Sequence, residues 1–152
     1  MNNDNRKFRV FDKRENKYLS GGFFLSEDGE LFVFIDGVLK SADSGRYVIE
    51  QCTGLRDKNG RLIYEGDVCL LYKIKYEIRW KDGGLGAREY PPCADTDGYI
   101  FSQTVPFTNR LYLREALKEI EVVGTIHDNP DDGWPVTPQG KPLPKGIKTW
   151  ER

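Results

Sequence analysis

The chain has 152 residues, a formal net charge of −1, and charged side chains at 31% of its positions. This length is typical of one domain whose core holds together without metals or disulfides. The near-neutral charge excludes a global positive field that would draw the chain onto nucleic acid or an anionic bilayer. No apolar run approaches the about 18 residues of a membrane helix, so we expect no membrane partner.

The cysteines and the first residues bear on the compartment. Cys52, Cys69 and Cys93 are odd in number and lack paired spacing, which argues against a disulfide framework. Residues 1–5 are polar, without the apolar segment of a signal peptide, and we expect them to be disordered. Both features favour a reducing cytoplasm.

The first third of the chain is typical of short strands separated by turns. Residues 8–11 alternate, and residues 17–25 follow as a second strand interrupted by Gly21 and Gly22, so we expect a hairpin. Residues 31–35, between two Asp-Gly turns, are apolar on both faces. Such a strand is predicted to be covered on both sides or to lie at an interface.

Residues 51–68, QCTGLRDKNGRLIYEGDV, contain two turn motifs. Residues 57–60 are Asp-Lys-Asn-Gly and residues 65–67 are Glu-Gly-Asp, and both glycine and asparagine tolerate the positive φ that tight turns need. Two short strands around two turns are predicted. The segment indicates a fold more than a chemistry.

Apolar and charged residues alternate over residues 68–81. Even positions are apolar or aromatic, whereas odd positions from Lys73 onward are charged, so one face is predicted to be buried and the other exposed. This stretch exceeds the common strand length of about 5 to 6 residues, so we expect either a strongly bent strand or a hairpin with an odd-length connection. Residues 82–84 then form a turn, and Pro91 and Pro92 end the partner strand.

The only stretch with helix-forming composition covers residues 109–119. Thr108 or Asn109 is its candidate N-terminal cap. We predict a short helix there, followed by a strand over residues 121–127.

The last segment, residues 130–152, contains five of the eight prolines, a composition typical of an extended arm. Trp134 and Trp150 are unusual in a solvated tail, because disordered segments are poor in aromatic residues. We therefore predict an interaction arm that docks on its own domain or on a neighbouring subunit.

Together these elements predict a mainly β fold, which is either a small, partly open β-barrel or a pair of packed small antiparallel sheets. One short helix and the extended C-terminal arm complete it. The Glu-Gly-Asp turn at residues 65–67 gives part of the fold an SH3-like character. The domain is expected over residues 6–129.

Three segments, taken in order, resemble the YopX family of bacteriophage and prophage proteins. They are residues 7–12 (KFRVFD), residues 51–68, and residues 122–130 (VVGTIHDNP). The resemblance implies a YopX-like, β-rich domain in the cytoplasm of a bacterial host cell, with phage or host proteins as candidate partners. It implies no assigned biochemical role.

No residue set in the sequence predicts catalysis, a cofactor or a metal. The motifs GxxxxGK[ST], GxGxxG, HExxH and GxSxG are absent. His127 precedes Asp128, but neighbours on a strand point to opposite faces, so the pair is interpreted as the start of a turn. The four cysteine and histidine residues are too scattered for zinc, and the acidic pairs at 65/67, 95/97 and 131/132 lack the spacing of a calcium loop. We expect a protein that is not an enzyme.

Lys73, Lys75, Arg79 and Lys81 form the charged side of the alternating segment, and such a row could track a phosphate backbone. The aromatic residues of the same segment lie on the opposite face, as expected of a solvated strand that covers a core. Because the overall charge is near zero, we favour the solvated face. These four residues are the candidate nucleic-acid-binding set.

Three hypotheses follow. The leading one is a non-enzymatic phage-type accessory protein that acts through protein contacts or self-assembly as a homo-oligomer. The second is a nucleic-acid-binding β module that uses the basic row. The third is an enzyme of undetected type, for which Cys93 is the candidate nucleophile and Asp95 and Asp97 are the candidate acid–base pair.

Overall fold

The computed structural model of the chain describes residues 7–43, 45–100, 102, 104–107 and 110–151. The segment predicted to be disordered, residues 1–5, and the candidate caps Thr108 and Asn109 lie outside the described residues. The described part consists of β-strands and one α-helix, α1 (Arg110–Ala116), so the predicted mainly β class is confirmed. Within it, no helix is long and apolar enough to cross a membrane.

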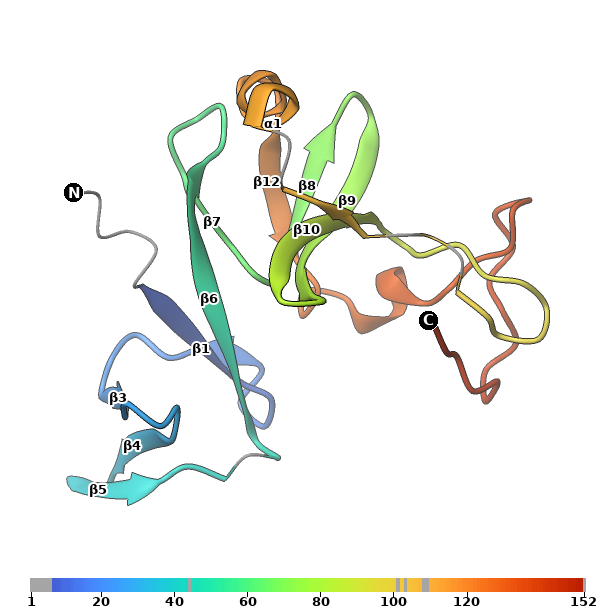
Figure 1. Cartoon of the computed structure of the whole chain (residues 1–152). Helices are drawn as coiled ribbons and strands as arrows, with labels where there is room; N and C mark the ends of the chain where they lie inside the picture. Colours follow the sequence, from blue (N-terminus) through green and yellow to red (C-terminus); the bar gives the residue numbers. More distant parts are fainter. Residues whose placement is uncertain (1–6, 44, 101, 103, 108–109, 152) are drawn as a thin grey trace.

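The first sheet has four antiparallel strands in the order β2-β1-β6-β7. In it, β6 is ten residues long and pairs with β1 along its first half. It then continues past β1 toward α1 and so connects the two halves of the molecule (Figure 1). The bounds are β1 Phe8–Asp12, β2 Lys17–Tyr18, β6 Tyr47–Arg56 and β7 Leu62–Tyr64.

A three-stranded sheet, β3 (Phe23–Leu25), β4 (Leu31–Ile35) and β5 (Val38–Ser41), packs against the first sheet. Val10 of β1 joins residues of β4 and β6 in the buried apolar cluster between them. The opposite face of β4 is open, and Phe34 on it is exposed. The strand predicted to be covered twice or to lie at an interface therefore buries only one of its two apolar faces.

The third sheet has five strands in the order β11-β10-β9-β8-β12, and α1 packs against it. Ala116 of α1 and Ile120 join Cys69 of β8 and Ile78 of β9 in the second buried cluster. The sheet curls as it passes from β12 to β10 (Figure 1). The bounds are β8 Asp67–Leu71, β9 Ile74–Lys81, β10 Gly84–Glu89, β11 Val105–Pro106 and β12 Glu121–Thr125.

The second predicted strand, residues 17–25, is two strands in two different sheets. β2 pairs with β1, whereas β3 pairs with β4. Gly21 and Gly22 lie between them with φ of +154° and +73°. Because these conformations suit glycine, the chain can leave one sheet there and enter the next.

Residues 68–81 form a hairpin, and the predicted odd-length connection is wrong. β8 and β9 are joined by two residues, Tyr72 and Lys73, with φ of +47° and +71°. Before the turn, the odd positions Cys69 and Leu71 are buried together with the even position Val68, whereas Tyr72 in the turn is exposed. Neither turn residue is typical of positive φ, and the continuous alternation therefore conceals the turn.

The C-terminal arm lies against its own domain. A 3-10 helix, η2 (Pro130–Gly133), begins it. Single bridges then join Val136 to Cys93 and Trp150 to Tyr99. The loop that follows β10 is thus the surface on which the arm packs.

Candidate functional site

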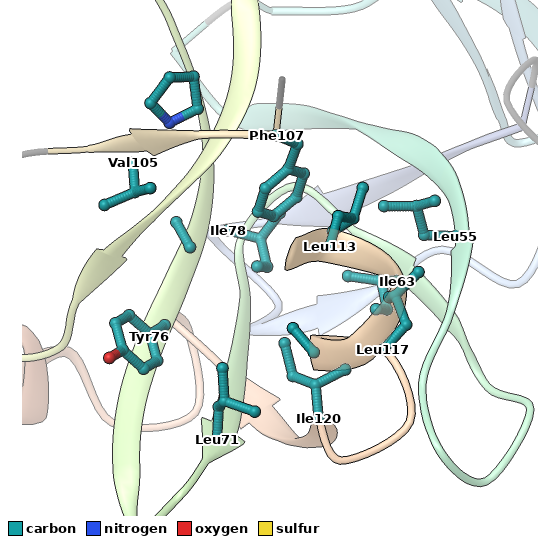
Figure 2. A pocket seen from close by; sticks show the side chains of 13 residues that line it. Leu55, Ile63, Leu71, Tyr76, Ile78, Val105, Phe107, Leu113, Leu117 and Ile120 are labelled. Atoms are coloured by element: carbon teal, nitrogen blue, oxygen red, sulfur yellow. The ribbon is translucent and has the colours of Figure 1, made fainter. Parts of the chain in front are cut away.

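An apolar cavity of about 340 Å³ lies between α1 and the five-stranded sheet (Figure 2). Leu113 and Ala116 of α1 form one wall, and Ile78 of β9 and Ala87 of β10 belong to the facing wall. The full lining is Leu55, Ile63, Leu71, Tyr76, Ile78, Ala87, Val105, Pro106, Phe107, Leu113, Ala116, Leu117 and Ile120.

The chemistry of the cavity suits binding and not catalysis. Among the lining side chains only that of Tyr76 has a polar atom, and this residue already has an interaction partner within the structure. The lining therefore offers no acid–base pair, no thiolate and no cation for an anionic ligand. What it can accept is a neutral apolar group.

The volume sets the size of that group. A cavity of about 150 Å³ lined by aliphatic and aromatic side chains holds one benzene molecule. The cavity of about 340 Å³ therefore has room for two phenyl rings. Sequence analysis missed this site because its lining comes from seven separate elements and two connections, none of which carries a motif.

Apolar side chains gather on the open face of the β3-β4-β5 sheet. Phe24 is 56% exposed and Phe34 is 47% exposed, and their rings are in edge contact with centroids 6.0 Å apart. Leu39 of β5 lies directly opposite Phe34 and is also exposed. These three residues, which we call the aromatic knob, form the kind of apolar patch that marks an interaction surface.

A buried polar cluster is centred on Glu50, which is 1% exposed. Its carboxylate accepts hydrogen bonds from Arg9 Nε at 2.7 Å and from the Tyr18 hydroxyl at 2.9 Å. Nε2 of His127 lies 2.6 Å from Glu50 Oε1. Arg9 Nη2 also donates to Asp67 Oδ1 at 2.7 Å. We call these five residues the Glu50 cluster.

The charged side chains of the Glu50 cluster pair with one another. Burial lowers the pKa of Arg9, but Asp67 and Glu50 outweigh burial and raise it above its ordinary value. Burial likewise raises the pKa of Asp67, and Arg9 opposes that rise. Phe11 stacks on the His127 ring with centroids 3.9 Å apart. Because its members hydrogen-bond to one another and its two carboxylates are buried, the cluster joins parts of the fold.

The same cluster joins the three segments on which the sequence resemblance rests. Arg9 comes from the first segment, Asp67 from the second and His127 from the third. Asp128, predicted to help open a turn, accepts a hydrogen bond from the backbone N–H of Thr125 at 2.8 Å. The cluster itself was missed because its centre, Glu50, lies one position before the second segment and carries no motif.

The predicted basic row does not form one uniform surface. Lys73 lies in the β8–β9 turn and Lys75 is exposed on β9. Arg79 Nη2 donates to Glu151 Oε1 at 2.8 Å, and Lys81 Nζ lies 3.6 Å from Glu151 Oε2. The C-terminal arm therefore covers half of the row.

Arg88 of β10 is a third cation at this position. Its Nη1 donates to Glu151 Oε2 at 3.0 Å and its Nη2 donates to Glu77 Oε2 at 2.8 Å. Sequence analysis missed Arg88 and Glu151, because the first belongs to the partner strand and the second to the arm. The pairing of Arg88 with Glu77 across β9 and β10 is the signal that places them together.

The two tryptophans of the arm have different surroundings. Trp134 Nε1 donates to the carbonyl of Leu143 at 2.7 Å, which closes the arm on itself. The Trp150 ring lies against Tyr99 with centroids 4.5 Å apart, yet it remains 55% exposed. Trp150 is thus the arm residue that contacts the preceding loop through its ring.

Cys93 and Asp95, two candidate residues of the enzyme hypothesis, have the surroundings of residues that support the fold. Burial raises the pKa of the Cys93 thiol, the direction opposite to that of an activated thiolate. Asp95 Oδ1 accepts the backbone N–H groups of Asp97 at 3.0 Å and Tyr99 at 2.9 Å and so shapes its loop. In the described ranges, His, Cys, Asp and Glu side chains form no group of three that could hold a metal ion.

Comparison with known proteins gives a family and a fold. The family model described as YopX protein matches residues 7–131. Curated proteins give no match. Among solved structures, the crystal structure of protein EF1440 from Enterococcus faecalis is similar, with 23% identity, a TM-score of 0.51, and coverage of 82% of this chain and 95% of that chain. At this identity the likeness shows the fold alone.

Proposed function

The chain belongs to the YopX family, and from this premise we propose that it is a non-enzymatic, phage-type accessory protein that self-assembles head to tail. The aromatic knob of one copy enters the apolar cavity of the next copy. The proposal rests on one observation: a single molecule presents both an apolar cavity with room for two rings and an exposed pair of aromatic rings.

The positions of the two surfaces favour contact between copies. The β3-β4-β5 sheet and α1 lie at opposite ends of the molecule (Figure 1), so one chain cannot fill its own cavity with its own knob. A contact between two different surfaces repeats from copy to copy and gives a ring or a filament. Because the knob is small compared with a standard interface, we expect weak, concentration-dependent association.

Acidic side chains border the knob, whereas the helix beside the cavity carries charges of both signs. The turns that border the knob carry Glu27, Asp28 and Asp36, all exposed. α1, which forms one wall of the cavity, carries the exposed Arg114 next to the exposed Glu115, so it lacks the uniform acidic charge of the knob end. This arrangement favours knob-to-cavity contact over contact between two acidic knob ends.

A complementation experiment tests the proposal by sedimentation or light scattering over a wide concentration range. Phe34→Ser removes half of the ring pair, and Ala116→Leu fills part of the cavity. Each variant alone should be monomeric at concentrations where the wild-type chain associates. Their equimolar mixture should give a dimer and nothing larger, because only one intact knob and one intact cavity remain.

The matched control is Val123→Ser, which removes an exposed apolar side chain of β12 outside both surfaces and should associate as the wild type does. A wild-type chain that is monomeric at every concentration would contradict the proposal. A mixture that stays monomeric while the wild type associates would also overturn the head-to-tail arrangement, because the contact would then be between like surfaces.

A further inference from the structure

Glu151 occupies a position among three cations that lie on one face of β9 and β10. Its two oxygens serve Arg79, Lys81 and Arg88. Burial raises the pKa of Glu151, but Arg79 and Arg88 outweigh burial and lower it below the ordinary value. The arm thus places an ionised carboxylate against a surface that is otherwise cationic.

The cation cluster has more donors than this carboxylate uses. Arg79 Nη1 and Arg88 Nε are buried and have no acceptor among the described residues. Arg88 as a whole is only 9% exposed. A buried guanidinium N–H without an acceptor is unfavourable, so a ligand that brings oxygens from more than one anionic group would satisfy the site better than the single carboxylate of Glu151.

We propose that Arg79, Lys81 and Arg88 form a binding site for the phosphate groups of single-stranded nucleic acid, and that Glu151 is held there as an intramolecular competitor. A phosphate group presents the oxygens that guanidinium groups bind in bidentate geometry. This inference is independent of the head-to-tail assembly proposed above, since the cavity and the knob contribute no residue to it.

The geometry of β9 favours a phosphate chain over an isolated anion. Lys75, Arg79 and Lys81 lie on the same side of one extended strand, where alternate residues are roughly 7 Å apart. Arg88 adds a fourth cation beside them, and it pairs with Glu77, which lies between Lys75 and Arg79 on the same side of β9. A linear row of positive charge is what a single-stranded backbone can follow.

Only the last residues of the arm have to move for the site to open. The backbone of Trp150 is held by two hydrogen bonds, from Ile100 N–H at 2.7 Å and to the Gly98 carbonyl at 3.0 Å. The earlier part of the arm has separate contacts, including the bridge between Val136 and Cys93. Release of Glu151 therefore does not require the whole arm to dissociate.

Fluorescence anisotropy of the full chain with a labelled oligo(dT) of about 12 nucleotides, a usual length for single-strand binders, tests the proposal. Glu151→Gln keeps the shape of the side chain and removes its charge. The apparent affinity should rise about tenfold, the factor expected if the site is open about a tenth of the time. Glu121→Gln makes the same change in net charge at a distant pair with Lys58 and should leave the affinity unchanged.

The binding residues are tested in the Glu151→Gln background. Arg79→Gln and Lys81→Gln should each weaken binding and reduce the slope of log K against log salt by about 0.7 per lost phosphate contact. Lys40→Gln, on the exposed strand β5, is the matched control and should change neither quantity. If circular dichroism shows that Arg79→Gln does not fold, Lys81→Gln alone, which keeps both guanidinium groups, still decides the question.

Three results would overturn the proposal. The first is a Glu151→Gln chain that binds the oligonucleotide no better than the wild type does. The second is binding by that variant which Arg79→Gln and Lys81→Gln leave unchanged. The third is a Glu151→Gln chain that does not bind DNA but associates with itself in solution. That result would mean that the three cations bind the arm of another copy.

Discussion

Glu50 and Asp67 have almost no exposure to solvent. Burying a charged carboxylate costs free energy unless the charge is paired. Arg9 pairs with both, and the backbone turn between β7 and β8 brings them together. Gly66 in that turn has a φ of +80°, and a Cβ on it would lie 2.4 Å from Glu50 Oε1. The turn therefore needs glycine for its backbone and also for the space that Glu50 occupies.

A matched pair of glycines separates these two requirements. Gly60 has the same φ of +80°, but a Cβ on it would have no heavy atom within 4 Å. Gly60→Ala should cost about 1 to 2 kcal/mol in the free energy of unfolding, the strain of a left-handed alanine. Gly66→Ala should cost about 1 to 3 kcal/mol more, because it also crowds Glu50.

Urea denaturation of both variants beside the wild type measures the difference. Equal costs would mean that the Glu50 carboxylate can move aside without loss, and that the cluster is not rigid. A larger cost for Gly60→Ala would contradict the packing argument outright.

At the scale of elements, α1 and the five-stranded sheet leave a cavity where a fully packed interface would be expected. Ala116 on α1 and Ala87 on β10 are the small side chains in its lining. Their size, and not a missing element, leaves the space. This end of the molecule can therefore be stabilised by adding volume, the reverse of the usual outcome in a packed core.

We expect Ala116→Leu to raise the free energy of unfolding by about 0.5 to 2 kcal/mol, as cavity-filling substitutions do. The measurement is urea denaturation at a concentration where the chain is monomeric. Ala94→Leu is the control, because Ala94 is fully buried but does not line the cavity. It should instead lose about 1 to 3 kcal/mol by overpacking, and a loss at Ala116 of the same size would show that the cavity cannot take the added side chain at this position.

The turns were predicted where the sequence carries a local turn motif, and they were missed where only strand pairing imposes the turn. Asp-Lys-Asn-Gly and Glu-Gly-Asp place two turns correctly, because the glycine of each motif favours positive φ in any context. The Tyr72-Lys73 turn was missed, because these residues adopt a positive φ that only the pairing of β8 with β9 imposes. The separation of β2 from β3 was missed for the same reason, since sheet membership depends on partners elsewhere in the chain.

At the scale of the whole molecule, buried or hydrogen-bonded carboxylates connect distant parts of the chain. Arg46 donates two hydrogen bonds to Asp12, at 2.9 Å and 2.6 Å, and lowers the pKa of Asp12 to about 2. Burial raises the pKa of Asp57, but backbone N–H groups, among them that of Val122, outweigh burial and lower it. These two links give the fold a dependence on pH.

The direction of this dependence follows from the pKa of Asp12, which the hydrogen bonds of Arg46 lower from the ordinary value of 3.8 to about 2 in the fold. A carboxyl whose pKa is lowered by folding stabilises the fold above about pH 4, and this contribution is lost as the pH falls toward 2. We expect the urea midpoint to fall over that interval. Asp12→Asn should lower the midpoint at pH 7 and flatten the fall below pH 4, whereas Asp28→Asn, in an exposed turn, should do neither. An Asp12→Asn profile parallel to that of the wild type would assign the acid sensitivity to other groups.

The candidate sites were less predictable than the fold. The basic row was found from its spacing on one strand, but Arg88 and Glu151, which pair beside it, lie 63 residues apart on other segments. The cavity has no signal in the sequence, because the apolar residues that line it look like any others of a core. A local pattern can indicate on which side of a strand a residue lies. It cannot indicate which distant segment of the chain packs against that side.

The spacing of the Glu50 cluster along the chain also bears on how the protein is made. Its contacts join residues separated by 41, 58 and 77 positions. Contacts of such long range form late, after the entropy of closing large loops has been lost. During synthesis, Glu50 and β8 emerge long before His127 and β12, so the nascent chain leaves Glu50 without its histidine partner and β8 with an open edge until the last shared segment leaves the ribosome. A chain that stops before this segment is therefore expected to remain incompletely folded and to be degraded by cellular proteases.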